Sequence, residues 1–571
     1  MKTYLTAILF FLLPGGSQAQ TDAHNYVKHD VMLDSLRTRK KTSVQYYDGL
    51  GRPSLSVANG IGGDGGSIRA LVSYGVHDMP VEKWLPVAGG STLDFITESE
   101  FKSQSQTFYG DSYAKVQNSY DYLDRAVSSY GAGKAWRDAS KDSKTAYGTN
   151  NAEEVKRYEA PCDGTFRLVE DGYYEKGTLY VKTASDEDGH SLAVYVDLHG
   201  RKVLELRGGN NDTYYVYDDL GNLRFVLSPE YQNSKNLTEL CYEYRYDGRH
   251  RCTWKRLPGC EPVEYWYDRG DRIVCFRDGE LRADGLFRFF LYDKLGRLSV
   301  QGLCTNCATG ENDIPVVSYT PVFSGFCNSL YQIPGGKTQP QNAQLEIVNY
   351  YDNYSFLNFN GFHKKDACYN ILNGGSSINA RNLLTGTVMR SSDGSMLCCV
   401  TYYDDRYRPS DVRRTYADGV AVVMTTEYSF TGKPLTVQYT VYKNGVTIPV
   451  TIENTYGASN DLLLSSVLKA NGGGTVLASN EYDGLGRLSK VTRGSNALYQ
   501  QYSYNVRGWL TQITGNGFRE ELYYTDGTVP CYNGDISRVK WDGDTSTPTN
   551  SSYNFRYDSL DRLVASEYTL H

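Results

Sequence analysis

The chain has 571 residues and a formal net charge of −7 at pH 7, from 66 acidic and 59 basic side chains. This balance gives no general attraction for nucleic acid or anionic lipid, so we expect neither partner. Fifty tyrosines and 56 glycines, against 17 prolines and 6 methionines, favour strands joined by tight turns over long helices. The composition therefore predicts an all-β protein.

The first residues have the pattern of an export signal. Met1 and Lys2 give a short positive start, an apolar run follows over residues 5–13, and small side chains precede Gln20. The run is too short to span a bilayer, and no later stretch approaches the ~18 continuous apolar residues of a membrane helix. We expect residues 1–19 to be a cleaved signal peptide and the mature protein to be secreted or held at the cell surface, without a membrane span.

Residues 20–145 form a leading module that ends in a polar stretch. Its glycine-rich segment Asn59–Gly66 partly resembles a calcium-binding nonapeptide. Such sites need tandem copies to stack their ligands, and only one copy is present, so we interpret the segment as a flexible hairpin loop. A helix is predicted only near residues 117–126.

A six-residue phrase recurs along the chain, as internal repeats do. It reads Tyr-Asp, any residue, Leu, then Gly or Asp, then Arg or Asn, and its five clearest copies start at Tyr47, Tyr217, Tyr292, Tyr482 and Tyr557. Looser copies fill the gaps, so that one unit has the length of about two strands. We assign the repeats to residues 146–571, with an irregular insertion near residues 303–344.

Each phrase predicts a β-hairpin. Alternating residues before the aspartate mark a strand with one packed face. The aspartate can accept hydrogen bonds from backbone amides two residues on, and glycine tolerates the positive φ that closes the turn. A lone hairpin is marginally stable in water, so the hairpins must pair edge to edge into one long coiled sheet or partial hollow shell.

The phrase is similar to the YD repeats of the bacterial Rhs family. Other segments resemble its N-terminal associated module of unassigned role or the repeats ahead of its core domain: residues 46–53, 84–86, 108–111, 130–136, 505–510, 521–524 and 531–537. The resemblance implies a hollow β-shell that encloses a toxic C-terminal domain. The chain stops at His571, before the family's self-cleaving core and toxin, so we expect a truncated, split or degenerate member without a toxin.

Cysteines and a glycine-rich turn are weak candidates for a ligand site. Cys304 and Cys307 have the spacing of half a zinc site, which Cys327, Cys368 or the pair Cys398-Cys399 could complete. A second Cys-x-x-Cys is missing, so disulfides or buried thiols are favoured over a metal. Residues 335–338 resemble part of a phosphate loop, but Tyr331 stands where its first glycine belongs, which indicates a surface turn.

No residue pattern indicates catalysis. The eight histidines include no His-Glu-x-x-His, and most aspartates are explained as turn formers, which leaves a glycosidase pair as a minor alternative. We therefore predict no catalytic, cofactor-binding or metal-binding residues and no cofactor, and a non-enzymatic shell or scaffold.

The alternative function is cell-surface adhesion or carbohydrate binding by exposed aromatic rings. The expected partner is a separately encoded core-and-toxin polypeptide or a cell-envelope component, with a glycan as another candidate. A partner polypeptide would add strands at the edge near residues 557–570.

Overall fold

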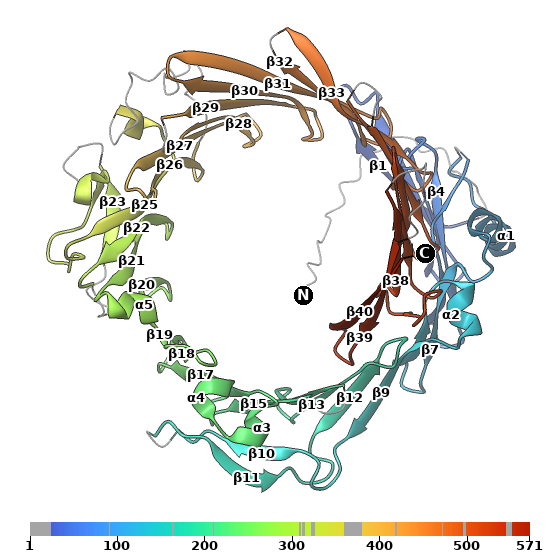
Figure 1. Ribbon diagram of the computed structural model, residues 1–571, viewed down its shortest axis with the longest axis horizontal. Coiled ribbons are helices and arrows are strands. Elements are labelled where there is room, and N and C mark those ends of the chain that lie inside the picture. The colour runs from blue at the N-terminus through green and yellow to red at the C-terminus, as the bar shows by residue number, and fades with distance from the viewer. Residues whose placement is uncertain are drawn as a thin grey trace.

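The computed structural model describes residues 24–570, except residues 91, 163–164, 209–210, 308–309, 311–314, 321–325, 359–379, 417–418, 471, 495–497 and 544–550. The predicted signal peptide and Cys368 lie outside the described residues. The described chain forms a ring whose wall is a β-sheet (Figure 1).

The strands of the leading part are β1 (Tyr26–Met32), β2 (Lys40–Tyr47), β3 (Pro53–Asn59), β4 (Ile68–Tyr74), β5 (Pro80–Trp84), β6 (Val87–Ala88), β7 (Lys115–Tyr120), β8 (Ala126–Tyr130) and β9 (Ser143–Thr149). The next strands are β10 (Lys156–Glu159), β11 (Val169–Tyr173), β12 (Tyr180–Ser185), β13 (Ser191–Val196), β14 (Lys202–Arg207), β15 (Asn211–Tyr217), β16 (Leu223–Leu227), β17 (Cys241–Tyr246), β18 (Cys252–Arg256), β19 (Val263–Tyr267), β20 (Ile273–Arg277), β21 (Phe287–Asp293), β22 (Leu298–Cys304), β23 (Val316–Tyr319), β24 (Tyr331–Gln332) and β25 (Gln344–Tyr351).

The remaining strands are β26 (Leu384–Arg390), β27 (Met396–Tyr403), β28 (Pro409–Thr415), β29 (Ala421–Tyr428), β30 (Pro434–Lys443), β31 (Val446–Tyr456), β32 (Leu463–Ala470), β33 (Gly473–Tyr482), β34 (Leu488–Arg493), β35 (Leu498–Tyr504), β36 (Leu510–Gly515), β37 (Phe518–Tyr523), β38 (Arg538–Asp542), β39 (Ser551–Tyr557) and β40 (Leu563–Leu570). The helices are α1 (Glu98–Tyr109), α2 (Lys134–Asp138), α3 (Tyr231–Ser234), α4 (Leu237–Leu240), α5 (Gly279–Ala283), η1 (Phe326–Asn328) and η2 (Ser355–Asn358).

The wall is essentially one antiparallel sheet in which strands pair in chain order. The order passes over β6, β10–β11 and β23–β24, because β5 pairs with β7, β9 with β12, and β22 with β25. Among the described residues, β1 pairs only with β2 and β40 only with β39. The prediction of an all-β protein built from hairpins in one long sheet is confirmed.

The repeated phrase makes one turn again and again. At Asp483 the carboxylate accepts hydrogen bonds from the Leu485 amide (3.0 Å), the Arg487 amide (2.9 Å) and Arg487 Nε (2.7 Å), and Gly486 has a φ of 81°. The aspartate therefore holds both the turn and the start of the return strand. The same three bonds are made at Asp48, Asp121, Asp197, Asp247, Asp268, Asp293, Asp404 and Asp558.

Tyrosine and arginine of the phrase join neighbouring repeats. Tyr292 Oη donates to the Ile273 carbonyl of the preceding repeat at 2.8 Å, and the Arg272 guanidinium lies 4.8 Å from the centre of the Tyr292 ring. A cation over an aromatic face contributes about 0.5–1 kcal/mol at exposed sites, and more when desolvated. The same pairing is found for Arg52 with Tyr74, Arg201 with Tyr217, Arg251 with Tyr267, Arg297 with Tyr351, Arg408 with Tyr428 and Arg487 with Tyr504.

One helix of the leading module was missed and another was wrongly expected. Residues 117–126, predicted as a helix, form most of β7, its turn and the start of β8, because Tyr120 and Asp121 begin another copy of the phrase. The actual helix, α1, starts after Thr97, whose hydroxyl accepts from the Glu100 amide, while the Glu100 carboxylate accepts from the Thr97 amide. This capping box satisfies amides that a helix start leaves unpaired.

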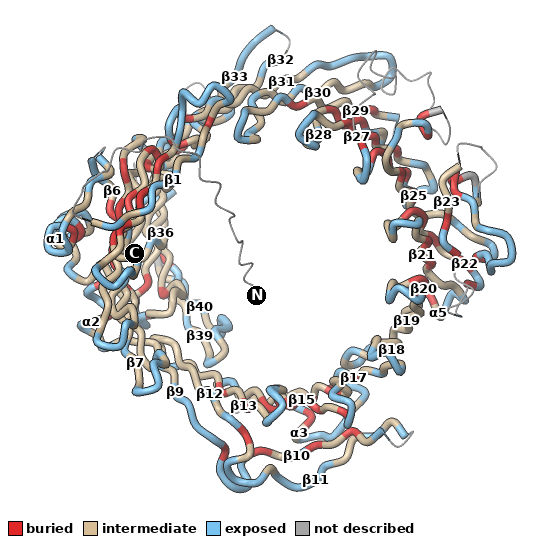
Figure 2. Tube along the Cα trace, turned by 180° about the vertical axis from the view of Figure 1, so that it is seen from behind, coloured by how far each residue is buried: buried red, intermediate tan, exposed pale blue. Residues whose placement is uncertain are grey.

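Elements outside the ring cover one face of the wall in three places. The helices α1, α3 and α5, the hairpin β10–β11 and the strand β23 lie on the outer side in both views (Figures 1 and 2). Buried side chains gather beneath them, around Phe101, Tyr214 and Tyr350 respectively for the first, middle and last cluster. The outward face is thus the packed face of the sheet there, and the hydrophobic core lies between wall and cover.

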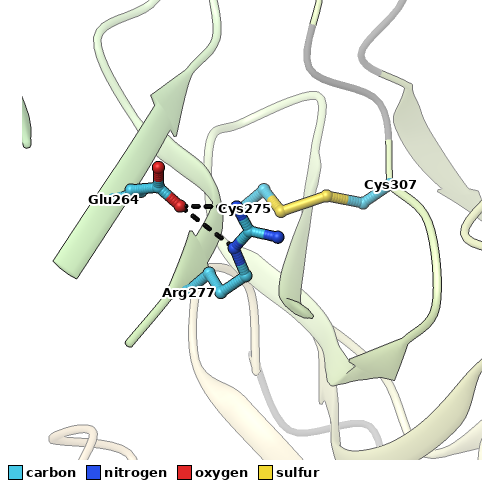
Figure 3. Close-up of a disulfide and its surroundings, with 4 residues drawn as sticks. All are labelled: Glu264, Cys275, Arg277 and Cys307. Atoms are coloured by element: carbon cyan, nitrogen blue, oxygen red, sulfur yellow. Dashed lines mark hydrogen bonds and ion pairs between the residues drawn. A yellow bond between two sulfur atoms is a disulfide. The ribbon is translucent and has the colours of Figure 1, made fainter. Parts of the chain in front are cut away.

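A disulfide ties part of the outer cover to the wall. Cys275 on β20 is bonded to Cys307, which begins an excursion outside the main sheet between β22 and β25 (Figure 3). Beside it, Arg277 Nη2 donates to Glu264 Oε2 at 2.7 Å. Cross-linking residues 32 apart removes freedom from the unfolded chain.

Candidate functional site on the inner wall

The cysteines form no zinc site in the described part of the chain. Cys307 is bonded to Cys275, while Cys304 is fully buried with a thiol whose pKa is raised to about 11 by burial. A neutral, buried thiol is a packing group and a poor metal ligand. Among the described cysteines, the disulfide interpretation therefore applies to one pair.

The two glycine-rich segments have structural places. Residues 335–338 are an exposed turn between β24 and β25, as expected. Residues 59–66 form the hairpin loop between β3 and β4, and this loop contacts a turn far along the chain: the Gly63 amide donates to the Asp483 carbonyl, between β33 and β34, at 3.1 Å.

One group within the described ranges has the spacing of metal ligands. Nδ1 of His190 and carboxylate oxygens of Asp186 and Asp561 all lie within 4.8 Å of one another. His190 Nδ1 already contacts Asp561 Oδ1 at 2.6 Å and Asp186 Oδ2 at 3.4 Å. The group is a polar contact between two distant turns, and we assign it no metal. No helix among the described residues is long and apolar enough to cross a membrane.

The faces of the wall can be followed through the strand register. Tyr350 faces outward, since it packs against Tyr331 and Phe356 of the cover. Directly opposed residues share a face, so the outer row continues from Tyr350 as Gly386, Val400, Arg413, Val423, Thr440 and Pro449. Neighbours in sequence face the inside of the ring.

On β30 and β31 the inward face of the sheet is more apolar than the outward face, the reverse of the covered parts of the wall. The outward residues of β30 and β31 include Gln438, Thr440, Thr447 and Thr451. The inward face carries a set that we call the apolar band: Val422, Met424, Val437, Tyr439, Val441, Ile448, Val450, Ile452 and Leu468. Each is only partly buried, and Ile448 is 45% exposed.

A second stretch of apolar surface lies elsewhere on the inner wall, in a shallow groove. The register places Tyr147, Tyr180 and Val196 on the face opposite the covered Tyr195. With Lys182 and Arg125 they line a groove of about 580 Å³. Tyr180 is 61% exposed. Contiguous exposed apolar surface of this kind is typical of interaction sites.

The turn aspartate Asp558 is expected to make the last hairpin sensitive to acid. Hydrogen bonds from Arg562 lower the pKa of Asp558 to about 2, from its usual value of 3.8. A carboxyl group whose pKa is lower in the folded than in the unfolded chain stabilises the fold at pH values above its unfolded pKa. This stabilisation is lost as the pH falls through the folded pKa.

We expect the Asp558 turn to open between about pH 4 and pH 2. The turn at Asn505 should persist, because the same bonds to the Arg507 and Trp509 amides are made by a side chain that does not titrate. Hydrogen exchange of the amides of both turns across this range checks the difference. Equal acid sensitivity of the two turns would contradict it.

The comparisons with known proteins agree with this architecture. Residues 20–149 match the family model described as Domain of unknown function (DUF6443). No curated protein sequence matches the chain. A crystal structure of TcdB2-TccC3-Cdc42 is 14% identical over 92% of this chain, with a TM-score of 0.56, and one of TcdB2-TccC3 without the hypervariable C-terminal region is 12% identical over 92%, with a TM-score of 0.57.

The chain spans about a quarter of those longer chains, covering 23% of each. At this identity the likeness shows the fold: a β-shell wall of the kind that the Rhs-like repeats predicted.

Sequence reasoning named no residue of the inner wall. The strands of the apolar band alternate apolar and polar residues as any half-buried strand does, so the sequence could not tell which face is covered. The contacts between neighbouring repeats could have been predicted from the phrase, because the arginine of one copy and the tyrosine of the next are spaced to meet across adjacent hairpins.

Proposed function

We propose that the protein is a non-enzymatic, secreted shell or scaffold segment that surrounds a partner polypeptide. The apolar band carries the proposal, because it leaves nine partly exposed apolar side chains on the inner face, whereas most outward residues of β30 and β31 are polar. Exposed apolar surface on the inner face favours the binding of a polypeptide inside the ring.

The partner is a separate polypeptide such as a core-and-toxin chain of the kind enclosed by Rhs-type shells. An adhesive or glycan-binding function is favoured less, because tyrosines of the phrase are used within the wall. Tyr217, Tyr267 and Tyr482, for example, donate their hydroxyls to carbonyls of the preceding repeat. Their rings and hydroxyls therefore serve the wall itself.

The test is purification of the tagged mature chain from the organism that encodes it, followed by identification of bound material. We expect a polypeptide partner that Ile448→Lys releases and Thr447→Lys retains. These residues are adjacent on β31 and both exposed, but they face opposite sides of the wall. An inner charge would be desolvated against an apolar partner.

Three results would count against the proposal. They are recovery of the wild-type chain without a polypeptide partner, recovery of envelope glycans alone, and equal retention or equal loss of the partner in both variants. The last would show that binding does not use the inner face. Circular dichroism of both variants establishes that the wall is intact.

A further inference from the structure

The first and last parts of the sheet lie side by side without a strand ladder between them. β1 and β40 each have one partner strand among the described residues, yet β1–β4 lie beside β33–β38 in Figure 1. The ring is therefore closed by loops, turns and side chains. These contacts, which we call the closure seam, involve the module matched by the family model of unknown function.

The first part of the seam is the glycine-rich segment. Asn460 Nδ2 donates to the Gly62 carbonyl at 2.9 Å and to the Gly63 carbonyl at 3.1 Å, and Arg39 Nε donates to the Ala458 carbonyl at 2.8 Å. A Cβ on Gly63 would lie 2.1 Å from the Asp483 carbonyl oxygen. Glycine is thus required here for close backbone approach between distant segments.

The second part is an arginine between two tryptophans. The Arg507 guanidinium lies 3.8 Å from the ring centre of Trp136 and 5.2 Å from that of Trp509. Its Nε donates to the Ala132 carbonyl at 2.9 Å, and Nη1 pairs with Glu187 at 3.0 Å. The side chain is 11% exposed, so this charge is largely desolvated and needs these partners.

The third part joins the first repeat hairpin to the last ones. Asp188 Oδ2 accepts from the amides of Tyr532 (2.6 Å) and Asn533 (3.1 Å), while Trp136 Nε1 donates to the Tyr532 carbonyl at 2.7 Å. Lys141 lies 4.9 Å from the Tyr532 ring. Contacts from two segments, the β12–β13 turn and the region of α2, thus converge on the loop before β38.

We infer that the module of residues 20–149 is a clasp: an interaction surface that, together with the turn between β12 and β13, closes the ring by binding the repeats at residues 457–537 of the same chain. This gives the module a function independent of what the ring contains. The glycine-rich segment supplies the backbone fit, and the tryptophan of α2 supplies the aromatic socket for Arg507.

The test compares the full-length wild-type chain with Arg507→Ala and Gly63→Ala. The matched controls are Arg406→Ala and Gly49→Ala. Arg406 occupies the same turn position as Arg507, with its amide bonded to the turn side chain, but it lies away from the seam against Phe430. A Cβ on Gly49 would meet nothing within 4 Å.

We expect an increased radius of gyration in small-angle scattering for both seam variants. The Gly63 and Tyr532 amides should exchange roughly tenfold faster or more, because local opening exposes them. The controls should keep the wild-type shape, and the wall around β20–β25 should keep its protection in all variants. Two independent seam substitutions guard against an effect of one misfolded variant.

Unchanged scattering and unchanged exchange at Gly63 and Tyr532 in both seam variants would overturn the inference. So would a wild-type mass that doubles with concentration while the closed shape is lost on dilution, since that would mean that two copies exchange modules. Equal opening in the Arg406→Ala control would also refute it, because the effect would then belong to the turn position.

Discussion

Replacing Asp404 by alanine is expected to lower the local free energy of unfolding by about 3 kcal/mol. Its carboxylate accepts from the amides of Arg406 and Arg408 and from Arg408 Nε, at 2.9, 2.9 and 2.7 Å. Bonds to a charged acceptor contribute more than neutral ones, and the substitution also leaves turn amides without their partner.

The effect should reach the next hairpin, because Arg408 also donates to the Ser429 carbonyl and lies over the Tyr428 ring. Stability in repeat architectures is set by neighbouring units, so hydrogen exchange along β27–β30 is the appropriate measurement. Asp405→Ala is the matched control: Asp405 is the next residue, is exposed, and accepts no hydrogen bond from a described residue. Equal losses in the two variants would contradict the role assigned to the phrase.

The repeated turn is the part of the fold that the sequence predicted best, because its chemistry is local. An aspartate, a residue with positive φ and an arginine stand within five positions, and their bonds form within one hairpin. The same locality explains an error. Residues 120–125 read Tyr-Asp-Tyr-Leu-Asp-Arg, which is the repeated phrase, and the prediction of a helix there overlooked this copy. The helix that does form was signalled by Thr97 and Glu100, three residues apart.

The remainder depends on contacts between residues far apart in the chain. Nothing near Cys307 identifies Cys275 as its partner, and the spacing to Cys304 suggested a different chemistry. Gly63 likewise has no local requirement for glycine that would reveal its contact with Asp483, about 420 residues later in the chain. The inner wall could not be predicted because alternation defines two faces but does not say which one is covered.

Trp136→Ala is expected to cost about 4 kcal/mol, measured as the loss of free energy of unfolding at the closure seam. Trp136 is 4% exposed, its ring centre lies 5.5 Å from that of Trp509, and its Nε1 donates to the Tyr532 carbonyl. Truncation removes this packing and the nearer of the two aromatic faces that contact the largely buried Arg507 guanidinium. Loss of a desolvated cation–π contact adds to the cost of the cavity, although Arg507 keeps its ion pair with Glu187.

Trp84→Ala separates loss of the seam from loss of a buried tryptophan. Trp84 is 7% exposed and packs within the leading module against Phe101, away from the repeats at the seam. Its truncation should destabilise the module by a similar amount while Tyr532 stays protected from exchange. Trp136→Phe should keep the ring closed and lose about 1 kcal/mol, since it removes one hydrogen bond but keeps an aromatic face for Arg507. If Trp84→Ala opens the ring as readily as Trp136→Ala, closure depends on the stability of the whole module and the socket has no separate role.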